Sequence, residues 1–283
     1  MKRPQWITIG IAVFLVAVIF IFGQRVPKKS NTPAATAQTK LNAGLSTDTI
    51  LQVAKRQLNQ EQAGKLAMLE SSISRGDVKD QQLKVYHQLG HFWIDSMGFF
   101  PPYAWYEGEA ARLENSEKSL TFAAHLFLSN LQEDNGSDIE LIKWKALQAK
   151  DLFERSLKIN PDNDSSKVGL GACYLFGNIS PTPMEGINKI REVTEKDSTN
   201  VYAQMMLVQG SLVSGQFDKA ITRLNAVCRM HPQNIEAILM LADMYERTND
   251  KTAAINWYRK SLPLIKRPDL KEVIEKRIND LTK

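Results

Sequence analysis

The chain has 283 residues, a hydrophobic content of 43% and a formal net charge of +5, a length that suits two ordinary domains or one array of repeats. Residues 1–29 contain five Lys or Arg and no Asp or Glu, so the remaining chain carries equal numbers of basic and acidic side chains. A nucleic-acid-binding protein needs an excess of cationic side chains to contact phosphates, and the composition therefore argues against that class.

The first predicted element is a transmembrane helix over residues 6–23, which follows a short basic tail at residues 1–5. Thr8 is the only polar side chain in this run. A helix of that length spans about 27 Å, close to the thickness of about 30 Å of a hydrocarbon core. Bulky and charged residues follow it instead of a small-residue cleavage site, so we expect an uncleaved single-pass anchor. The basic tail favours a cytoplasmic N-terminus, which in a bacterium places the rest of the chain in the periplasm.

Residues 24–46 are small, polar and proline-containing, which is typical of a flexible linker. Residues 47–76 then predict an N-terminal helix, because apolar residues recur on one side of it until Arg75-Gly76-Asp77 ends the pattern. Gly64 lies in the middle of this helix and is expected to weaken it or to divide it into two. The sequence leaves open whether this segment packs on the helices that follow.

The region after residue 83 contains an internal repeat with a period of 34 residues. Leu207 recurs as Leu241, and Ala220 recurs as Ala254. Further parts of the same pattern occur earlier in the chain, at Leu170, Gly171, Tyr174, Ala149, Phe153 and Pro161. This pattern resembles the tetratricopeptide repeat. The resemblance implies an all-α fold in which paired antiparallel helices stack into a right-handed superhelical solenoid.

The predicted solenoid covers residues 83–268, and a C-terminal capping helix covers residues 269–283. Its units fall at about 83–115, which is degenerate, and then at 117–163, 164–200, 201–234 and 235–268. Ser137 with Glu140, and Asp269 with Glu272, have the spacing of helix N-terminal caps.

Two further features are interpreted as core. Cys173 and Cys228 each lie in an apolar helical stretch, where cysteine behaves as a small hydrophobic residue. The aromatic residues between Phe92 and Tyr106 are dense enough to form the core of the degenerate unit or an exposed patch for a partner, and we favour the core.

No motif in the sequence predicts catalysis or a cofactor: there is no phosphate-binding glycine loop, no nucleophile elbow and no zinc-protease motif. We therefore expect a non-enzymatic protein. His87, His91 and Asp95 recur every four residues on one predicted helix, so they project from one face and form a weak candidate metal site. The alternative is a polar lining of a groove, and we expect no bound metal.

The resemblance also implies where a partner binds, because the first helix of each pair lines the groove in that family. The register places Met205 on the inner surface, while Leu207 and Ala220 belong to the core. The groove changes from apolar to acidic along its length, and it lacks the Lys and Asn with which some members hold a C-terminal carboxylate. The residues that line it by this reasoning are Val168, Ala172, Phe176, Tyr202, Met205, Gln209, Leu212, Glu236, Asp243, Glu246 and Arg247.

These observations predict a membrane-anchored scaffold or adaptor that binds a protein or peptide, in assembly or biogenesis of the bacterial envelope. Two alternatives remain open at this point. One is a metal-binding protein that uses His87 and His91, and the other is an organelle import receptor of the same layout. The missing carboxylate-binding residues argue against the second alternative.

Overall fold

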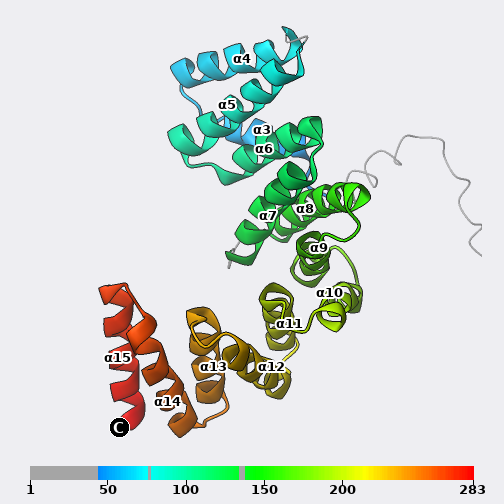
Figure 1. Ribbon diagram of the computed structural model, residues 1–283. Coiled ribbons are helices and arrows are strands. Elements are labelled where there is room, and N and C mark those ends of the chain that lie inside the picture. Colours follow the sequence, from blue (N-terminus) through cyan, green and yellow to red (C-terminus); the bar gives the residue numbers. More distant parts are fainter. Residues whose placement is uncertain (1–43, 76–77, 134–137) are drawn as a thin grey trace, which may run out of the picture. The chain divides into compact units, whose positions relative to one another are not determined.

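The computed structural model describes residues 44–75, 78–133 and 138–283, and every regular element in these ranges is a helix (Figure 1). The predicted anchor at residues 6–23 and nearly all of the linker lie outside the described residues. Within the described ranges, no helix combines the length and the apolar character that crossing a membrane requires.

The helices follow one another with short connections. In chain order they are α3 (Thr47–Lys55), α4 (Gln60–Arg75), α5 (Lys79–Met97), α6 (Phe100–Glu114), α7 (Glu117–Glu133), α8 (Ile139–Ile159), α9 (Asp164–Phe176), α10 (Met184–Lys196), α11 (Val201–Val213), α12 (Phe217–Met230), α13 (Ile235–Arg247), α14 (Lys251–Ser261), the 3₁₀ turn η1 (Leu262–Leu264) and α15 (Pro268–Thr282).

Consecutive helices form pairs, and each pair contacts the next. Helix α5 packs on α6, α7 on α8, α9 on α10, α11 on α12, and α13 on α14. The second helix of one pair then contacts the first helix of the following pair, and α15 packs on α14. This arrangement confirms an all-α array of helical repeats. The right-handed superhelical sense and the exact unit boundaries stay predictions.

The N-terminal segment divides into two helices, but the break is not at Gly64, which lies inside α4. The break falls at Arg56–Asn59 because Asn59 starts a new helix. The backbone N–H of Gln62 donates to Asn59 Oδ1 at 2.9 Å, and the backbone N–H of Asn59 donates to Gln62 Oε1 at 3.0 Å. In this reciprocal cap each side chain accepts from the backbone N–H of the other residue. The cap thus supplies acceptors for N–H groups that have no carbonyl partner at the start of α4.

Asparagine side chains also cap the first helix of three pairs, α9, α11 and α13. The side-chain oxygens of Asn163, Asn200 and Asn234 accept from the backbone N–H three residues later, at 2.8, 3.0 and 3.0 Å. Asp138 caps α8 by accepting from the Glu140 N–H; Ser137, the predicted cap, lies outside the described residues. The predicted cap at Asp269 is wrong, because its carboxylate pairs with Arg267 and α15 has no side-chain cap.

The repeated apolar positions form the core as the period predicts. Leu207, Leu241, Ala220 and Ala254 are all buried. The close approach of α9 and α10 depends on Gly171, since a Cβ there would lie 2.6 Å from the backbone oxygen of Gly186.

The two residue groups interpreted as core are also placed there. Cys173 and Cys228 are buried free thiols, and burial raises the pKa of both. From the aromatic run, Phe92, Trp93 and Tyr106 are buried.

Candidate functional site

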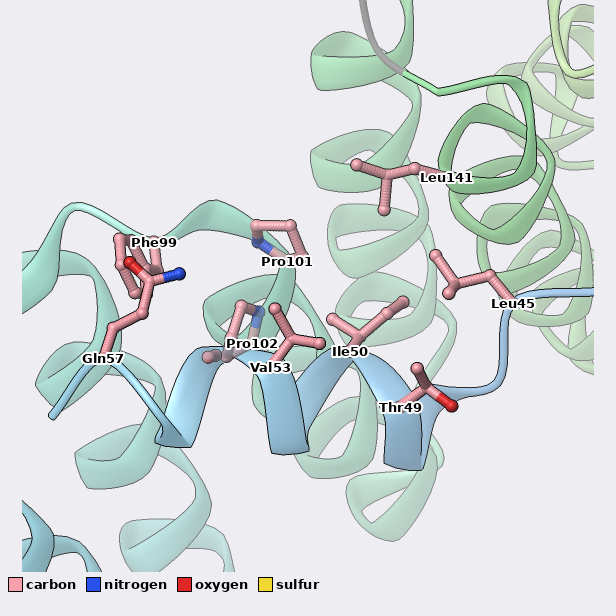
Figure 2. Close-up of a pocket in the computed structure, with 10 residues that line it drawn as sticks. Leu45, Thr49, Ile50, Val53, Gln57, Phe99, Pro101, Pro102 and Leu141 are labelled. Atoms are coloured by element: carbon pink, nitrogen blue, oxygen red, sulfur yellow. The ribbon is translucent and has the colours of Figure 1, made fainter.

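An apolar pocket of about 310 Å³ lies between α3, the start of α6 and the start of α8 (Figure 2). Val53 and Ile50 of α3 form one side of it, and Pro101 with Pro102 of α6 form the other. Figure 2 shows Leu45 and Leu141 at one end and Phe99 with Gln57 at the opposite end. We call this site the apolar pocket; its lining is Leu45, Thr49, Ile50, Val53, Ala54, Gln57, Phe99, Pro101, Pro102 and Leu141.

Helix α3 is held in place by contacts with residues far away in the sequence. The Trp144 indole N–H donates to Thr47 Oγ1 at 3.0 Å, and Ile50 is buried in the same cluster as Trp144. At the other end of α3, Lys55 pairs with Glu70 of α4 at 2.8 Å. These contacts fix the wall of the pocket, while the two prolines fix the first turn of α6, where no intrahelical N–H bond is lost.

The lining is almost entirely hydrocarbon, with one hydroxyl and one amide near its ends. Val53 remains 50% exposed although its side chain faces an apolar recess. A pocket of this composition binds by removing apolar surface from water, at about 25 cal/mol per Å². It has the size and chemistry to accept a bulky apolar side chain such as Leu or Phe.

The predicted groove residues of α9 and α11 are placed differently from the expectation. Val168, Ala172 and Met205 are buried, so their assignment to a partner-binding surface is wrong. Met205 belongs to the apolar cluster formed by α11, α12 and α13. Phe176, Tyr202, Gln209 and Leu212 are partly exposed, and their role in partner binding stays a prediction.

Side chains of α7 and α11 meet each other and thereby cover part of α9. His125 of α7 contacts the ring of Tyr202 at 5.6 Å and hydrogen-bonds Ser165 of α9 through Nε2 at 2.8 Å. Further along, Gln132 of α7 donates to Gln209 Oε1 of α11 at 3.3 Å. Because the intervening α9 carries short residues on this side, longer side chains from its neighbours reach over it. Burial lowers the pKa of His125.

The C-terminal part of the predicted groove is less acidic than its sequence indicates. Glu246 pairs with Arg277 of α15 and also accepts from the Tyr258 hydroxyl at 3.1 Å. Asp243 pairs with Arg247 at 2.8 Å. Among the predicted groove carboxylates, only Glu236 has no ion-pair or hydrogen-bond partner within the described chain. The charge available to a partner at this end is therefore small.

His87 and His91 do not converge on one site. His87 Nδ1 lies 2.9 Å from Glu107 Oε2 of α6, whereas His91 Nδ1 lies 3.1 Å from Asp95 Oδ2. No group of three or more His, Cys, Asp or Glu within the described residues has an arrangement that holds a metal ion. The two imidazoles lie on one helix, but each faces a different carboxylate, so they form no shared cluster within the described residues.

Sequence reasoning missed the apolar pocket and the exposed side of α7. Phe122 is 63% exposed and lines a separate recess of about 340 Å³ beside His87 and Glu107. The spacing of Phe122, His125 and Gln132 matches one face of a helix and was available as a signal. No local signal existed for the pocket, because its walls come from three segments far apart in the sequence.

Comparison with known proteins shows similarity to a family profile, to a protein from Haemophilus influenzae and to several solved structures. The profile described as "Tetratricopeptide repeat" matches residues 235–264. The putative cytochrome c-type biogenesis protein CcmH of Haemophilus influenzae is 23% identical over 108 residues, which is 38% of this chain and 24% of that protein. The match thus spans about a quarter of the length of that relative.

Two solved structures are among those to which the chain is similar. PilW, described as a widely conserved type IV pilus biogenesis factor, is 16% identical with a TM-score of 0.47, covering 71% of this chain and 86% of that chain. MamA from Desulfovibrio magneticus is 19% identical with a TM-score of 0.43, covering 67% of this chain and 96% of that chain.

Proposed function

The chain is a tetratricopeptide repeat protein, and from this premise we propose that it is a membrane-tethered scaffold that holds a protein partner. Residues 6–23 anchor it in the bacterial inner membrane, and the helical array lies on the periplasmic side. The role is binding and positioning; no catalytic step is assigned to any residue. The partner is a protein or peptide that carries an exposed apolar side chain.

The single observation that carries this proposal is the open apolar pocket beside Val53 (Figure 2). Monomeric proteins usually cover recesses of this kind, and an uncovered one marks an interaction site. The lining of the pocket also includes Leu45, which lies at the end of the predicted linker at residues 24–46. It therefore stays within reach of the membrane surface, where a tether raises the effective concentration of membrane-bound partners.

The process that this scaffold serves is assembly or biogenesis of envelope proteins. Support comes from the 108-residue match to a putative cytochrome c-type biogenesis protein. Cytochrome c biogenesis is accordingly the specific process that we propose, with the scaffold holding an assembly partner.

The binding test uses photo-crosslinking from intact membranes. A photoreactive residue at position 53 of the full chain should crosslink to a membrane or periplasmic protein, which mass spectrometry then identifies. Val53→Asp should abolish capture of that protein, because a carboxylate in an apolar recess is desolvated without a partner. Val273 of α15 is 61% exposed and lies outside the pocket, so Val273→Asp is the matched control. Unchanged capture by Val53→Asp would contradict the proposal.

The topology test is independent of the binding test. Alkaline phosphatase fused after Lys40 should be active in a bacterial host, since the enzyme matures only after export. An inactive fusion would place the helical array in the cytoplasm and would contradict the periplasmic assignment.

A further inference from the structure

A second recess, of about 360 Å³, lies between α10, α11 and α12. Three basic side chains line it, Arg191 from α10 and Lys219 with Arg223 from α12, and no Asp or Glu is among its lining residues. We call it the cationic pocket. It shares no residue with the apolar pocket, and two of its three walls are second helices of their pairs.

The positive charges of this pocket are poorly neutralised within the described chain. Arg223 donates to the neutral amide oxygen of Gln204 at 3.0 Å, and Lys219 donates to the amide oxygen of Gln216 at 2.6 Å. Neither has a carboxylate partner among the described residues. Arg191 pairs with Glu195 at 3.3 Å, but both side chains are more than half exposed, and such a pair is weak.

Arg191 and Arg223 also repel each other. Partial burial, and secondly the charge of Arg191, lower the pKa of the Arg223 guanidinium. Like charges that line one recess, with only a weak exposed ion pair to neutralise them, raise the free energy of the empty site. A bound anion offsets this cost and forms charge-assisted hydrogen bonds with the guanidinium groups.

The hydroxyl groups of the pocket do not compete for the role of donor. Ser211 Oγ donates to the Leu207 carbonyl oxygen at 2.8 Å, and Ser214 Oγ donates to the Gly210 carbonyl oxygen at 2.9 Å. The donors left for a ligand are therefore the cationic ones. Met184, Ile187 and Leu207 supply the apolar part of the lining, and Met184 is exposed.

We infer that the cationic pocket binds an acidic segment of a protein partner, in which an Asp or Glu carboxylate contacts Arg191, Lys219 and Arg223 while a neighbouring apolar side chain contacts Met184 and Ile187. The inference rests on the protein-binding role proposed above but uses a different surface. A phospholipid surface fits less well, because α10 carries as many acidic as basic side chains and its face therefore has no net positive charge to attract an anionic bilayer.

The test measures fluorescence anisotropy of a labelled peptide of alternating Glu and Leu, titrated with the full chain in detergent micelles. We expect saturable binding, and none for the same peptide with Gln in place of Glu. Arg223→Gln and Lys219→Gln should each weaken binding about tenfold, the loss expected for one charge-assisted hydrogen bond. Arg229→Gln removes the same charge from an exposed position of α12 outside the pocket and should leave binding unchanged.

Three results would overturn the inference. One is unchanged peptide affinity in the Lys219→Gln/Arg223→Gln double variant. Another is an equal loss in Arg229→Gln, which would indicate attraction by net charge alone. The third is displacement of the peptide by inorganic phosphate and not by acetate at equal ionic strength, which would assign the pocket to phosphate groups. Lys219 is exposed, so Lys219→Gln keeps the test decisive should Arg223→Gln disturb folding.

This inference and the scaffold role fail in different experiments. Photo-crosslinking from position 53 reports on the apolar pocket alone, whereas the peptide titration reports on the cationic pocket. If the crosslink from position 53 is retained while the Glu and Gln peptides bind equally well, only the inference about the cationic pocket is overturned. Specific peptide binding without any crosslink from position 53 would support the cationic pocket and contradict the role of the apolar one.

Discussion

The imidazole ring of His125 in α7 lies 5.6 Å from the ring of Tyr202 in α11, inclined to it by 62°. These two helices belong to different pairs, and α8, α9 and α10 lie between them in the chain. The contact directly joins α7 and α11, the first helices of the second and fourth pairs. It covers short side chains of α9, the first helix of the pair between them. A surface that the register alone assigns to partner binding is in this way partly closed by the protein itself.

The first prediction concerns acidification of this contact. His125 touches Phe153, Tyr202 and Ser165, all uncharged, and burial lowers its pKa. As the pH falls through the ordinary histidine range, near 6.5, the unfolded chain takes up this proton before the folded chain does. The His125 contribution to stability is therefore complete above that range and declines below it.

Thermal melts at pH 7.5 and pH 5.0 measure this effect. The loss of melting temperature on acidification should be smaller in His125→Gln than in the natural chain. His91→Gln changes an exposed histidine and serves as the control. An identical pH response of the natural chain and His125→Gln would contradict the prediction.

The second prediction concerns Met205, which is 4% exposed and belongs to the core. Met205→Ala should lower the free energy of unfolding by about 2–5 kcal/mol, as for other large-to-small core substitutions. Gln209→Ala, one turn along on the partly exposed side of α11, should cost less than about 1 kcal/mol. Urea denaturation followed by circular dichroism gives both values. Similar free energies of unfolding for the two variants would contradict the assignment of Met205 to the core.

The third prediction compares two glycines. A Cβ at Gly171 would meet the Gly186 backbone oxygen at 2.6 Å, whereas a Cβ at Gly64 meets nothing within 4 Å. Gly171→Ala should destabilise the protein by about 1–3 kcal/mol, because α9 and α10 must move apart. Gly64→Ala should stabilise α4 by about 0.5–1 kcal/mol through its better helix propensity. The same denaturation experiment tests the signs, which must be opposite.

The fourth prediction concerns how α3 is held. Thr47→Val removes the hydroxyl that accepts from Trp144 Nε1 at 3.0 Å and leaves a buried indole N–H without a partner, at a cost of about 1–3 kcal/mol. Amide hydrogen exchange across residues 47–55 should become faster, since α3 opens more often. Thr282→Val, which loses only a bond inside α15, is the control. Unaltered exchange would mean that apolar contacts alone hold α3.

The sequence by itself determined the helical repeat architecture and most of its core. The period of 34 residues placed Leu207 and Leu241 in equivalent buried positions, and it did the same for Ala220 and Ala254. These assignments succeed because residues at one repeat position pack against their own pair and its direct neighbours. The break in the N-terminal segment was also readable in principle, since Asn59 and Gln62 have the spacing of a local cap.

Tertiary structure alone decided which of the repeat positions face solvent. Val168 and Ala172 have the register of surface residues and are buried, in the helix that side chains from α7 and α11 reach across. Exposure depends on the side chains of other helices as well as on the short residues of α9, and no pattern within α9 alone encodes it. The apolar pocket is a stronger case, because the bond from Trp144 to Thr47 joins residues 97 positions apart. A site whose walls come from distant segments exists only once the chain has folded.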